Sequence, residues 1–280
     1  MIWALGDRAL DFGARVRIMG ILNTTPDSFY DGGRYLERQA AVERGLQLAE
    51  EGADLIDIGG ESSRPPLYGE AQPVPAAEEC RRVVPVIEGL RRHTRVPLSV
   101  DTTKARVARE ALAAGADVVN DISALRADPQ MPGVAAAHNA PVILMHRPPP
   151  APDPGALVEG IRDFLAQRLE AARQAGIARA AVDPGIGFGK TAAGNLALVR
   201  RLGEFAGLGC PVLVGASRKS FIWKTLGLSP EESLEGSLAV ATLCALQGVH
   251  ILRVHDVKET VRAVRLAEAV AAVPERGAWR

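Results

Sequence analysis

Cysteine and aromatic side chains are scarce in this sequence, and neither sign of charge is in excess. The three cysteines, Cys80, Cys210 and Cys244, are odd in number and far apart. This excludes a disulfide framework and a Cys-x-x-Cys metal or redox pair, and it indicates a reducing compartment. Lys plus Arg number 33 and Asp plus Glu number 33, so no overall field attracts nucleic acid or an anionic membrane. Any anion must therefore be bound by a local cluster.

Targeting and membrane-spanning signals are also missing. Residues 1–8 contain no basic region ahead of an apolar stretch, and nowhere do about 18 apolar residues follow one another. We therefore expect a cytoplasmic protein without membrane or nucleic-acid partners. The 280 residues, 47% of them hydrophobic, can bury one large core and are close to the roughly 250 residues of a (β/α)8 barrel. We predict a single domain over residues 1–280.

Short apolar runs recur along the chain and end at polar residues. Four of them begin at a glycine, which favours the end of a preceding helix, and β-branched runs of this kind are typical of buried parallel strands. The eight expected strands are residues 17–23, 52–60, 96–101, 115–121, 141–146, 176–183, 211–217 and 248–256.

Stretches with helical periodicity lie between these strands, for example over residues 42–49, 107–112, 157–169, 234–245 and 261–267. Eight alternations of strand and helix predict an α/β fold of the closed (β/α)8 TIM-barrel type. An open doubly wound sheet would usually carry a glycine-rich phosphate turn after its first strand, and Asn23-Thr-Thr-Pro-Asp is not one. The proline-rich residues 147–154 are interpreted as a stiff loop within the domain.

Polar residues gather where the expected strands end, which is where (β/α)8 barrels build their active sites. These residues are Asn23, Asp101, Asn120, His146, Asp183, Ser217, Lys219, Arg253 and His255. Alternation along a strand places Arg253 and His255 on one face of their strand, and it likewise places Ser217 and Lys219 on one face of theirs. The last two strands would thus present three possible cations, Lys219, Arg253 and His255, to a phosphorylated group. Arg253, between apolar neighbours, needs a partner.

Less specific interpretations stay open for several of these residues. Asp101, Asn120 and Asp183 could cap loops, Lys219 alone could be solvated, and His255 could be structural. The segment GIGFGKT at residues 185–191 looks like a nucleotide loop, but a P-loop needs a glycine where Pro184 stands. Its glycines would instead let the backbone approach a flat ligand, with Phe188 available to contact it.

The motifs resemble the dihydropteroate synthase family, over about residues 15 to 270. The matching segments are GILNTTPDSF at 20–29, GGESSRP at 59–65, SVDTTK at 99–104, NDI at 120–122, LMH at 144–146, DPGIGFG at 183–189, SRK at 217–219 and RVHDV at 253–257. The resemblance implies a transferase of folate biosynthesis. Such an enzyme condenses 6-hydroxymethyl-7,8-dihydropterin pyrophosphate with p-aminobenzoate to give 7,8-dihydropteroate and pyrophosphate.

The resemblance also implies roles for particular residues. Asp101, Asp183, Lys219, Arg253 and His255 would be catalytic. The pterin would lie against Asp101, Asn120, Met145, Asp183 and Lys219. The aminobenzoate would lie against Thr25, Phe29, Ser63, Arg64, Pro65, Phe188 and Ser217, and the pyrophosphate against Asn23, Ser63, Arg64, Arg253 and His255. Mg²⁺ is the implied cofactor, with Asn23 as its ligand. The resemblance further implies a sulfonamide target and a homodimer formed through the late barrel helices.

One departure from the family pattern stands out. The segment that follows Arg64 is longer by a few residues than is usual, and we expect residues 66–69 to alter loop closure and sulfonamide affinity. Two alternatives remain within the pterin-binding barrels: a non-catalytic binding protein, and a methyltransferase-type domain, which would not need the cations expected to release pyrophosphate. A Schiff-base aldolase using Lys219 is a third.

Overall fold

The computed structural model describes residues 1–24, 33–61, 73–147 and 156–273 of the chain. Its centre is a parallel sheet of eight strands in the order β8-β7-β6-β5-β4-β3-β10-β9. The strands are β3 (Arg17–Asn23), β4 (Leu55–Gly59), β5 (Leu98–Asp101), β6 (Val118–Asp121), β7 (Val142–Met145), β8 (Ala180–Asp183), β9 (Leu213–Val214) and β10 (Ile251–Val254). Each strand falls within an expected range.

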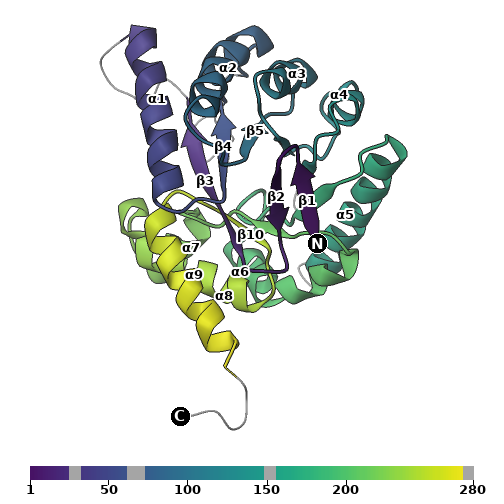
Figure 1. The fold of residues 1–280 in the computed structure, drawn as a ribbon. Coiled ribbons are helices and arrows are strands. Elements are labelled where there is room, and N and C mark those ends of the chain that lie inside the picture. The colour runs from purple at the N-terminus through teal and green to yellow at the C-terminus, as the bar shows by residue number, and fades with distance from the viewer. Residues whose placement is uncertain (25–32, 62–72, 148–155, 274–280) are drawn as a thin grey trace.

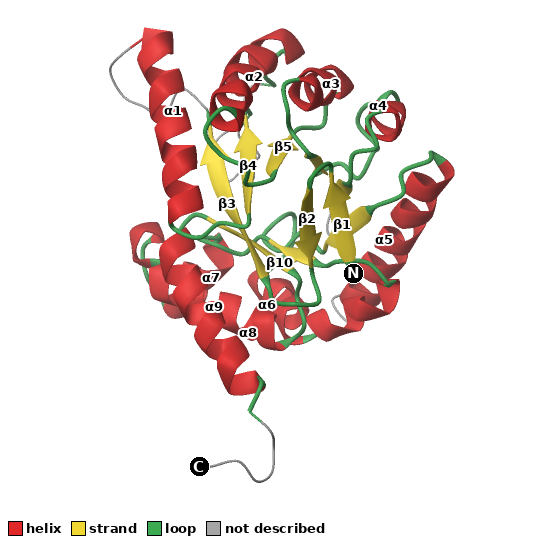
Figure 2. Cartoon of the chain, viewed as in Figure 1, coloured by secondary structure: helices red, strands yellow, loops and turns green. Residues whose placement is uncertain are grey.

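The sheet closes on itself between its two terminal strands. Val182 of β8 forms a parallel bridge with Val212, just before β9, and the Val182 amide donates to the Pro211 carbonyl at 3.0 Å. The closed ring, with helices around it (Figures 1 and 2), confirms the predicted (β/α)8 barrel.

Helices follow the strands and form the outer layer (Figure 2). They are α1 (Gly33–Glu50), α2 (Ala76–Arg91), α3 (Ala105–Ala113), α4 (Met131–Ala137), α5 (Leu157–Gln174), α6 (Ala192–Arg200), α7 (Ser220–Leu226), α8 (Leu234–Leu246) and α9 (Val257–Ala271), with 3₁₀ turns at Leu202–Leu208 and Pro230–Glu232. The expected helical stretches are confirmed. Among the described residues, no helix combines the length and the apolar character needed to cross a bilayer. Most of the proline-rich loop lies outside the described residues.

Alternating side chains along each strand divide the apolar core into two parts, because successive residues of a strand face opposite sides of the sheet. One set faces the helices and belongs to the larger cluster, including Ile18, Ile56 and Val100. The other set fills the inside of the barrel at the end where the strands begin, which we call the lower end. It consists of Met19, Leu55, Val118, Ile143, Ala181, Leu213 and Ile251. The barrel interior is thus packed and apolar where its strands begin.

A two-stranded hairpin that the sequence analysis did not predict covers this lower end. It comprises β1 (Ile2–Leu5) and β2 (Arg8–Asp11), joined by Gly6 and Asp7, and it crosses the middle of the ring of helices in Figure 1. Gly6 has φ of 62°, which a glycine adopts without strain in a two-residue hairpin turn. The buried side chains of the hairpin, Trp3, Leu5, Leu10 and Phe12, complete the inner cluster.

Candidate active site at the barrel mouth

The inside of the barrel changes from apolar to polar over two residues of each strand, which is the distance between successive inward-facing side chains. Two residues beyond the inner apolar layer, the same inward-facing rows carry different side chains. Leu55 is followed by Asp57, Val118 by Asn120, Ile143 by Met145, Ala181 by Asp183, and Ile251 by Arg253. The five strands β4, β6, β7, β8 and β10 therefore bring these side chains, all polar except Met145, to one mouth.

Arg253 and Asp57 form the centre of this polar layer. The Arg253 Nε donates to Asp57 Oδ2 at 2.6 Å, and Arg253 Nη2 donates to Asp101 Oδ2 at 2.9 Å. The Asn120 Nδ2 donates to the same Asp57 oxygen at 3.0 Å. Asp57 is fully buried and Asp101 is nearly so. Four side chains from four strands are thereby locked into one network.

Asp57 is a site residue that the sequence analysis missed. It lies between Ile56 and Ile58 in a fully buried strand, and a charged residue between apolar neighbours was the signal that singled out Arg253. Applied to both strands, that criterion would have identified the two residues as each other's partner. Arg253 was expected to have a partner, and the partners are Asp57 and Asp101.

Asp183 lies across the mouth from this network, at the end of β8. Burial raises the pKa of its carboxyl, and the Gly185 amide, which donates to Asp183 Oδ1 at 2.7 Å, opposes the rise, as do the charges of Lys219 and Lys190. Burial likewise raises the pKa of Asp101, and Arg253 opposes that rise. Both carboxyls are partly desolvated acceptors at the edge of a pocket, as expected of functional acids.

Lys219 reaches the mouth by a route other than the predicted one. Strand β9 ends at Val214, so alternation along a strand does not set the directions of Ser217 and Lys219. A turn does, in which Arg218 has φ of 58° and the Lys219 amide donates to the Ala216 carbonyl. The Lys219 Nζ lies 3.7 Å from the centroid of the Phe188 ring. Burial, then the charge of Arg253, lowers the pKa of Lys219 to about 8.

His255 and Ser217 form a hydrogen-bonded pair beside Lys219. The Ser217 Oγ lies 3.1 Å from His255 Nδ1, and it accepts from the His255 backbone amide at 3.3 Å. Burial, followed by the charges of Arg218 and Arg253, lowers the pKa of His255 to about 4. His255 is therefore neutral at pH 7 in this state of the protein. Of the three possible cations at the mouth, Lys219 and Arg253 therefore carry charge, and His255 offers a neutral imidazole.

The remaining expected site residues divide into two groups. Met145 is buried at the end of β7, and Asn23 is exposed at the end of β3, with its Oδ1 on the side of Gly59 and Asp101. Thr25, Phe29, Ser63, Arg64 and Pro65 lie outside the described residues, as does the longer segment at residues 66–69. His146 is buried against Phe164, with ring centroids 5.1 Å apart, and supports the wall of the mouth.

A preformed all-protein metal site is not found among the described residues, where no three His, Cys, Asp or Glu side chains gather to hold an ion. The exposed amide oxygen of Asn23 is a hard donor at the mouth. Mg²⁺ usually keeps several waters and binds proteins through one or two oxygens plus substrate phosphates. Asn23 therefore fits an ion that arrives with a phosphorylated substrate, and it does not fit a permanently held one.

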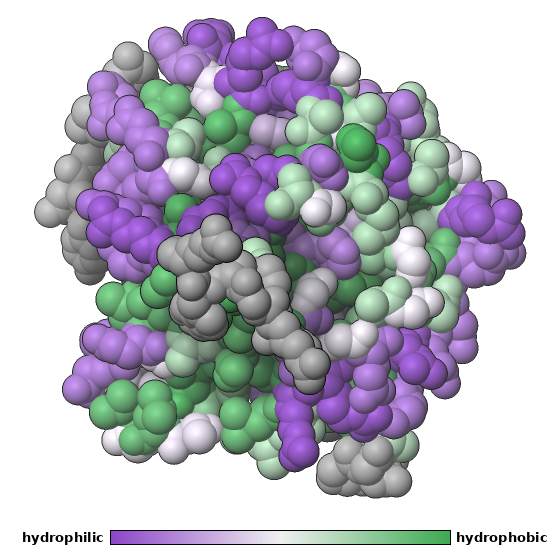
Figure 3. Space-filling model, turned by 60° about the horizontal axis from the view of Figure 1, so that its bottom comes forward, coloured by the Kyte–Doolittle hydropathy of each residue, from purple (hydrophilic) through white to green (hydrophobic). Residues whose placement is uncertain are grey.

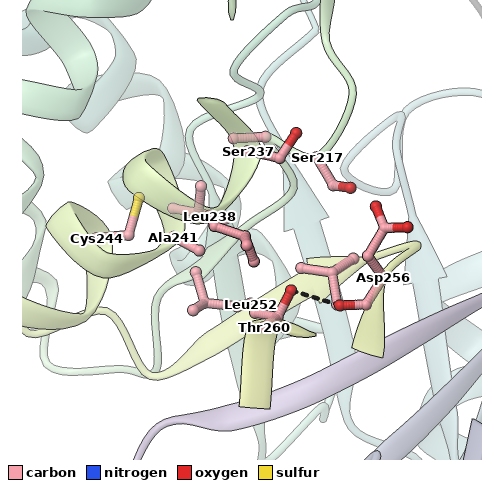
Figure 4. A pocket seen from close by; sticks show the side chains of 11 residues that line it. Ser217, Ser237, Leu238, Ala241, Cys244, Leu252, Asp256 and Thr260 are labelled. Carbon is pink, nitrogen blue, oxygen red and sulfur yellow. Dashed lines mark hydrogen bonds between the residues drawn. The ribbon is translucent and has the colours of Figure 1, made fainter. Parts of the chain in front are cut away.

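A small cavity lies behind the mouth, between strands β9 and β10 and helices α8 and α9 (Figure 4). Its lining is mostly apolar and small, with Leu238, Ala241 and Cys244 on α8 facing Leu252, and the Thr260 hydroxyl donates to the Asp256 carbonyl at 2.6 Å. It has room for about one water molecule. A cavity of this size does not admit a substrate.

Fold and site together define a (β/α)8-barrel enzyme whose mouth combines three buried acids, an amide, a lysine and a paired arginine. Comparison with known proteins identifies the family to which this enzyme belongs. A family model described as "Pterin binding enzyme" matches residues 19–255. The dihydropteroate synthase of Synechocystis sp. is 44% identical over 275 residues, which cover 95% of this chain and 94% of that protein.

Solved structures agree with these sequence matches. Dihydropteroate synthase from Xanthomonas albilineans with 4-aminobenzoic acid has a TM-score of 0.91 and 48% identity, covering 98% of this chain and 99% of that one. In complex with 7,8-dihydropteroate the same enzyme has a TM-score of 0.89. The Yersinia pestis enzyme in a sulfonamide drug complex has a TM-score of 0.89 and 42% identity, covering 98% and 100% of the two chains. The chain belongs to the dihydropteroate synthase family.

Proposed function

We propose that the polar cluster at the barrel mouth is where this chain condenses 6-hydroxymethyl-7,8-dihydropterin pyrophosphate with p-aminobenzoate. The products are 7,8-dihydropteroate and pyrophosphate, and the chain is a transferase like its relatives. One observation supports the roles assigned to these residues below: Asp101, Asn120 and Asp183 lie at the same mouth as Arg253 and Lys219.

The pterin would be bound by the acceptor groups of the mouth. Because Asn120 uses its Nδ2 to reach Asp57, its Oδ1 is the amide atom left for a ligand. Asp183 adds a carboxylate, which can accept two parallel bonds from an amino group and a neighbouring ring N–H. Both groups would match the donor edge of the pterin. Met145, buried two residues beyond Ile143, would line the slot beside them.

Bond breaking would be assisted by charges on both sides of the reacting carbon. The pterin ring can delocalise the cation left when its CH₂–O bond breaks, and Asp101 and Asp183 would offset that charge. Arg253, held rigidly by Asp57 and Asp101, and the His255 ring would stabilise the departing pyrophosphate. With Ser217 Oγ beside His255 Nδ1, the hydroxyl can donate to that nitrogen, so that His255 Nε2–H donates toward the leaving group.

The aminobenzoate would lie against Phe188 and Lys219, on the outer side of the pterin. The contact between the Lys219 ammonium and the Phe188 ring makes a joint apolar and cationic wall, which suits an aromatic ring that carries a carboxylate. Holding the arylamine in line with the methylene carbon can contribute on the order of 7–11 kcal/mol to the reaction. Thr25, Phe29, Ser63, Arg64 and Pro65 would complete this subsite. Sulfonamides would compete here, and residues 66–69 would set their affinity.

Mg²⁺ would be held by the Asn23 amide oxygen together with the pyrophosphate oxygens. When bound, it neutralises charge on the leaving group. Chelation by EDTA should therefore slow the reaction without lowering the melting temperature, because no described cluster of side chains depends on the ion.

The decisive experiment mixes purified protein with the pterin pyrophosphate, p-aminobenzoate and Mg²⁺ and measures both products. Dihydropteroate and inorganic pyrophosphate should appear in equal amounts. Binding of pterin without either product would favour a non-catalytic barrel. Methyl transfer from a methylated pterin would favour the methyltransferase type. A borohydride-trapped adduct on Lys219 with a carbonyl substrate would favour an aldolase.

We also propose that the chain works in the cytoplasm. There it would form a homodimer through its late helices. Helix α8 is mostly apolar and has no distinct polar face, although a helix at a barrel surface usually has one. Leu243 and Leu246 on α8 and Leu266 and Val270 on α9 are each at least half exposed, and α8 packs along α9. Figure 3 shows apolar side chains gathered at the lower left, the side where Figure 1 places α7 to α9. Light scattering should give twice the chain mass, and Leu266→Glu should reduce it to that of a monomer.

A further inference from the structure

The loop between β8 and α6 forms one wall of the mouth. It contains three glycines with positive φ, Gly185, Gly187 and Gly189, and it carries Phe188 between the last two. The loop is packed tightly on both sides: a Cβ at Gly187 would lie 2.7 Å from Lys219 Cδ, and one at Gly185 would lie 2.0 Å from the His146 carbonyl oxygen. A loop this rich in glycine keeps one shape only when other groups hold it.

Lys190 holds this loop from within. Its Nζ donates to the carbonyl oxygens of Gly185 at 2.7 Å, Phe188 at 3.0 Å and His146 at 3.4 Å. An ammonium group has three N–H donors, so these carbonyls use all of them. The lysine that made this segment look like a phosphate loop is therefore committed to the protein's own backbone.

Asn195 of α6 holds the same loop from the outer side. Its Oδ1 accepts from the Gly187 amide at 2.7 Å, and its Nδ2 donates to the Thr191 carbonyl at 2.9 Å. The Asn195 side chain is buried. Asn195 thus fixes the peptide group between Ile186 and Gly187, and Lys190 fixes the peptide group that follows Phe188.

We infer that Lys190 is a positioning residue for the aminobenzoate subsite, acting through Phe188. By tying the Phe188 and Gly185 carbonyls to the end of β7 at His146, it sets the place of the Phe188 ring, against which Lys219 lies. This inference rests on the proposed function, which assigns the Phe188 and Lys219 wall to p-aminobenzoate. On the pterin side, Lys190 makes no hydrogen bond to Asp57, Asn120 or Arg253, and it acts on Asp183 only through its charge and through the Gly185 peptide.

The test replaces Lys190 by methionine, which has a similar length and no donor, and measures KM for each substrate separately. Loss of charge-assisted donors to buried carbonyls should raise KM for p-aminobenzoate about tenfold. KM for the pterin pyrophosphate should change much less. Lys224→Met, on the exposed side of α7, is the matched control and should change neither value. If Lys190→Met does not fold, Lys190→Gln keeps an N–H donor and should show the same split to a smaller extent.

A double-mutant cycle with Phe188→Ala separates positioning from general destabilisation. Since Lys190 is argued to act through Phe188, Lys190→Met should add little to the aminobenzoate KM once the ring is gone. Equal changes in both KM values, an unchanged aminobenzoate KM, or additive effects in the cycle would each overturn the inference. If the wild-type protein itself forms no dihydropteroate, the proposed function fails instead.

Discussion

The two ends of the barrel interior use the same strands for opposite purposes. At the lower end, inward-facing Leu55, Val118 and Ile251 pack against the hairpin in an apolar layer. Two residues further along the same strands, Asp57, Asn120 and Arg253 are joined by hydrogen bonds. The lower layer stabilises by apolar burial, whereas the upper layer carries charge whose desolvation must be offset by pairing. Substitutions at the lower end should therefore affect stability alone, whereas substitutions at the upper end, which is the mouth, should also affect activity.

The largest expected effect is at the upper end. Arg253→Met would leave Asp57 and Asp101 side by side without their shared cation, and breaking a buried ion pair costs about 3–5 kcal/mol of folding free energy. Loss of a preorganised contact to the leaving group should also lower kcat by about 10²–10³-fold. Steady-state kinetics and thermal unfolding measure the two effects. A variant with nearly normal kcat would show that Arg253 serves the fold alone.

At the lower end, Trp3→Ala should reduce stability with little effect on catalysis. Trp3 is 3% exposed and packs edge-on against Phe12 at a centroid distance of 5.1 Å, so its removal should cost about 3–5 kcal/mol. Urea unfolding at pH 7 gives the loss, and KM and kcat measured well below the melting temperature should match those of the wild type. A kcat reduced as strongly as in Arg253→Met would contradict the proposed separation of the two ends.

A smaller effect is expected for Asp57→Asn, which keeps the shape of the network and removes its charge. Arg253 and Asn120 would lose a charged acceptor, which is worth about 1.5–3 kcal/mol for a hydrogen bond of this kind. That loss should appear mainly as a higher KM for the pterin pyrophosphate, because Asn120 would no longer be held with its oxygen toward the ligand. Asp121→Asn is the control. It lies next to Asn120 but bonds Ser123 and the Leu125 amide, so it should leave both KM values unchanged.

The sequence predicted the barrel and its polar rim because both follow from local patterns. Apolar runs that end in Asp101, Asn120 and Asp183 identify strand ends directly, and parallel strands bring such ends together whatever the details of packing. The hairpin also had a local signal, Gly6-Asp7 between two short alternating runs. It was missed because residues 1–8 were considered only as a targeting segment.

Other features could not be predicted, because they depend on contacts between distant residues. Lys190 donates to a backbone carbonyl 44 positions away. Because every residue has such a carbonyl, the sequence does not indicate which one the lysine binds. The neutral state of His255 likewise follows from its burial between Arg218 and Arg253. Pairing of Asp57 with Arg253 spans 196 positions, and the sequence analysis predicted only that Arg253 needs a partner.

The smallest expected effect is a pH dependence at the upper end, where activity should fall and stability should rise as the pH increases. Burial and the charge of Arg253 lower the pKa of Lys219 to about 8, although Asp183 and Asp101 oppose this and Lys190 adds to it. The pH profile of kcat/KM reports groups of the unliganded enzyme. If protonated Lys219 binds substrate, kcat/KM should therefore fall severalfold as the pH rises from 7 to 9, with a midpoint near 8.

Stability should respond in the opposite direction over the neighbouring range. Between the folded pKa of about 8 and the usual value of 10.5, the unfolded chain binds more protons at Lys219 than the folded chain does. The contribution of Lys219 to the free energy of unfolding must then rise with pH in that window. Lys219→Arg, which stays charged, should lose both the alkaline fall in kcat/KM and this rise in stability relative to wild type. An alkaline fall that persists in the arginine variant would assign it to another group and leave Lys219 without a titrating role.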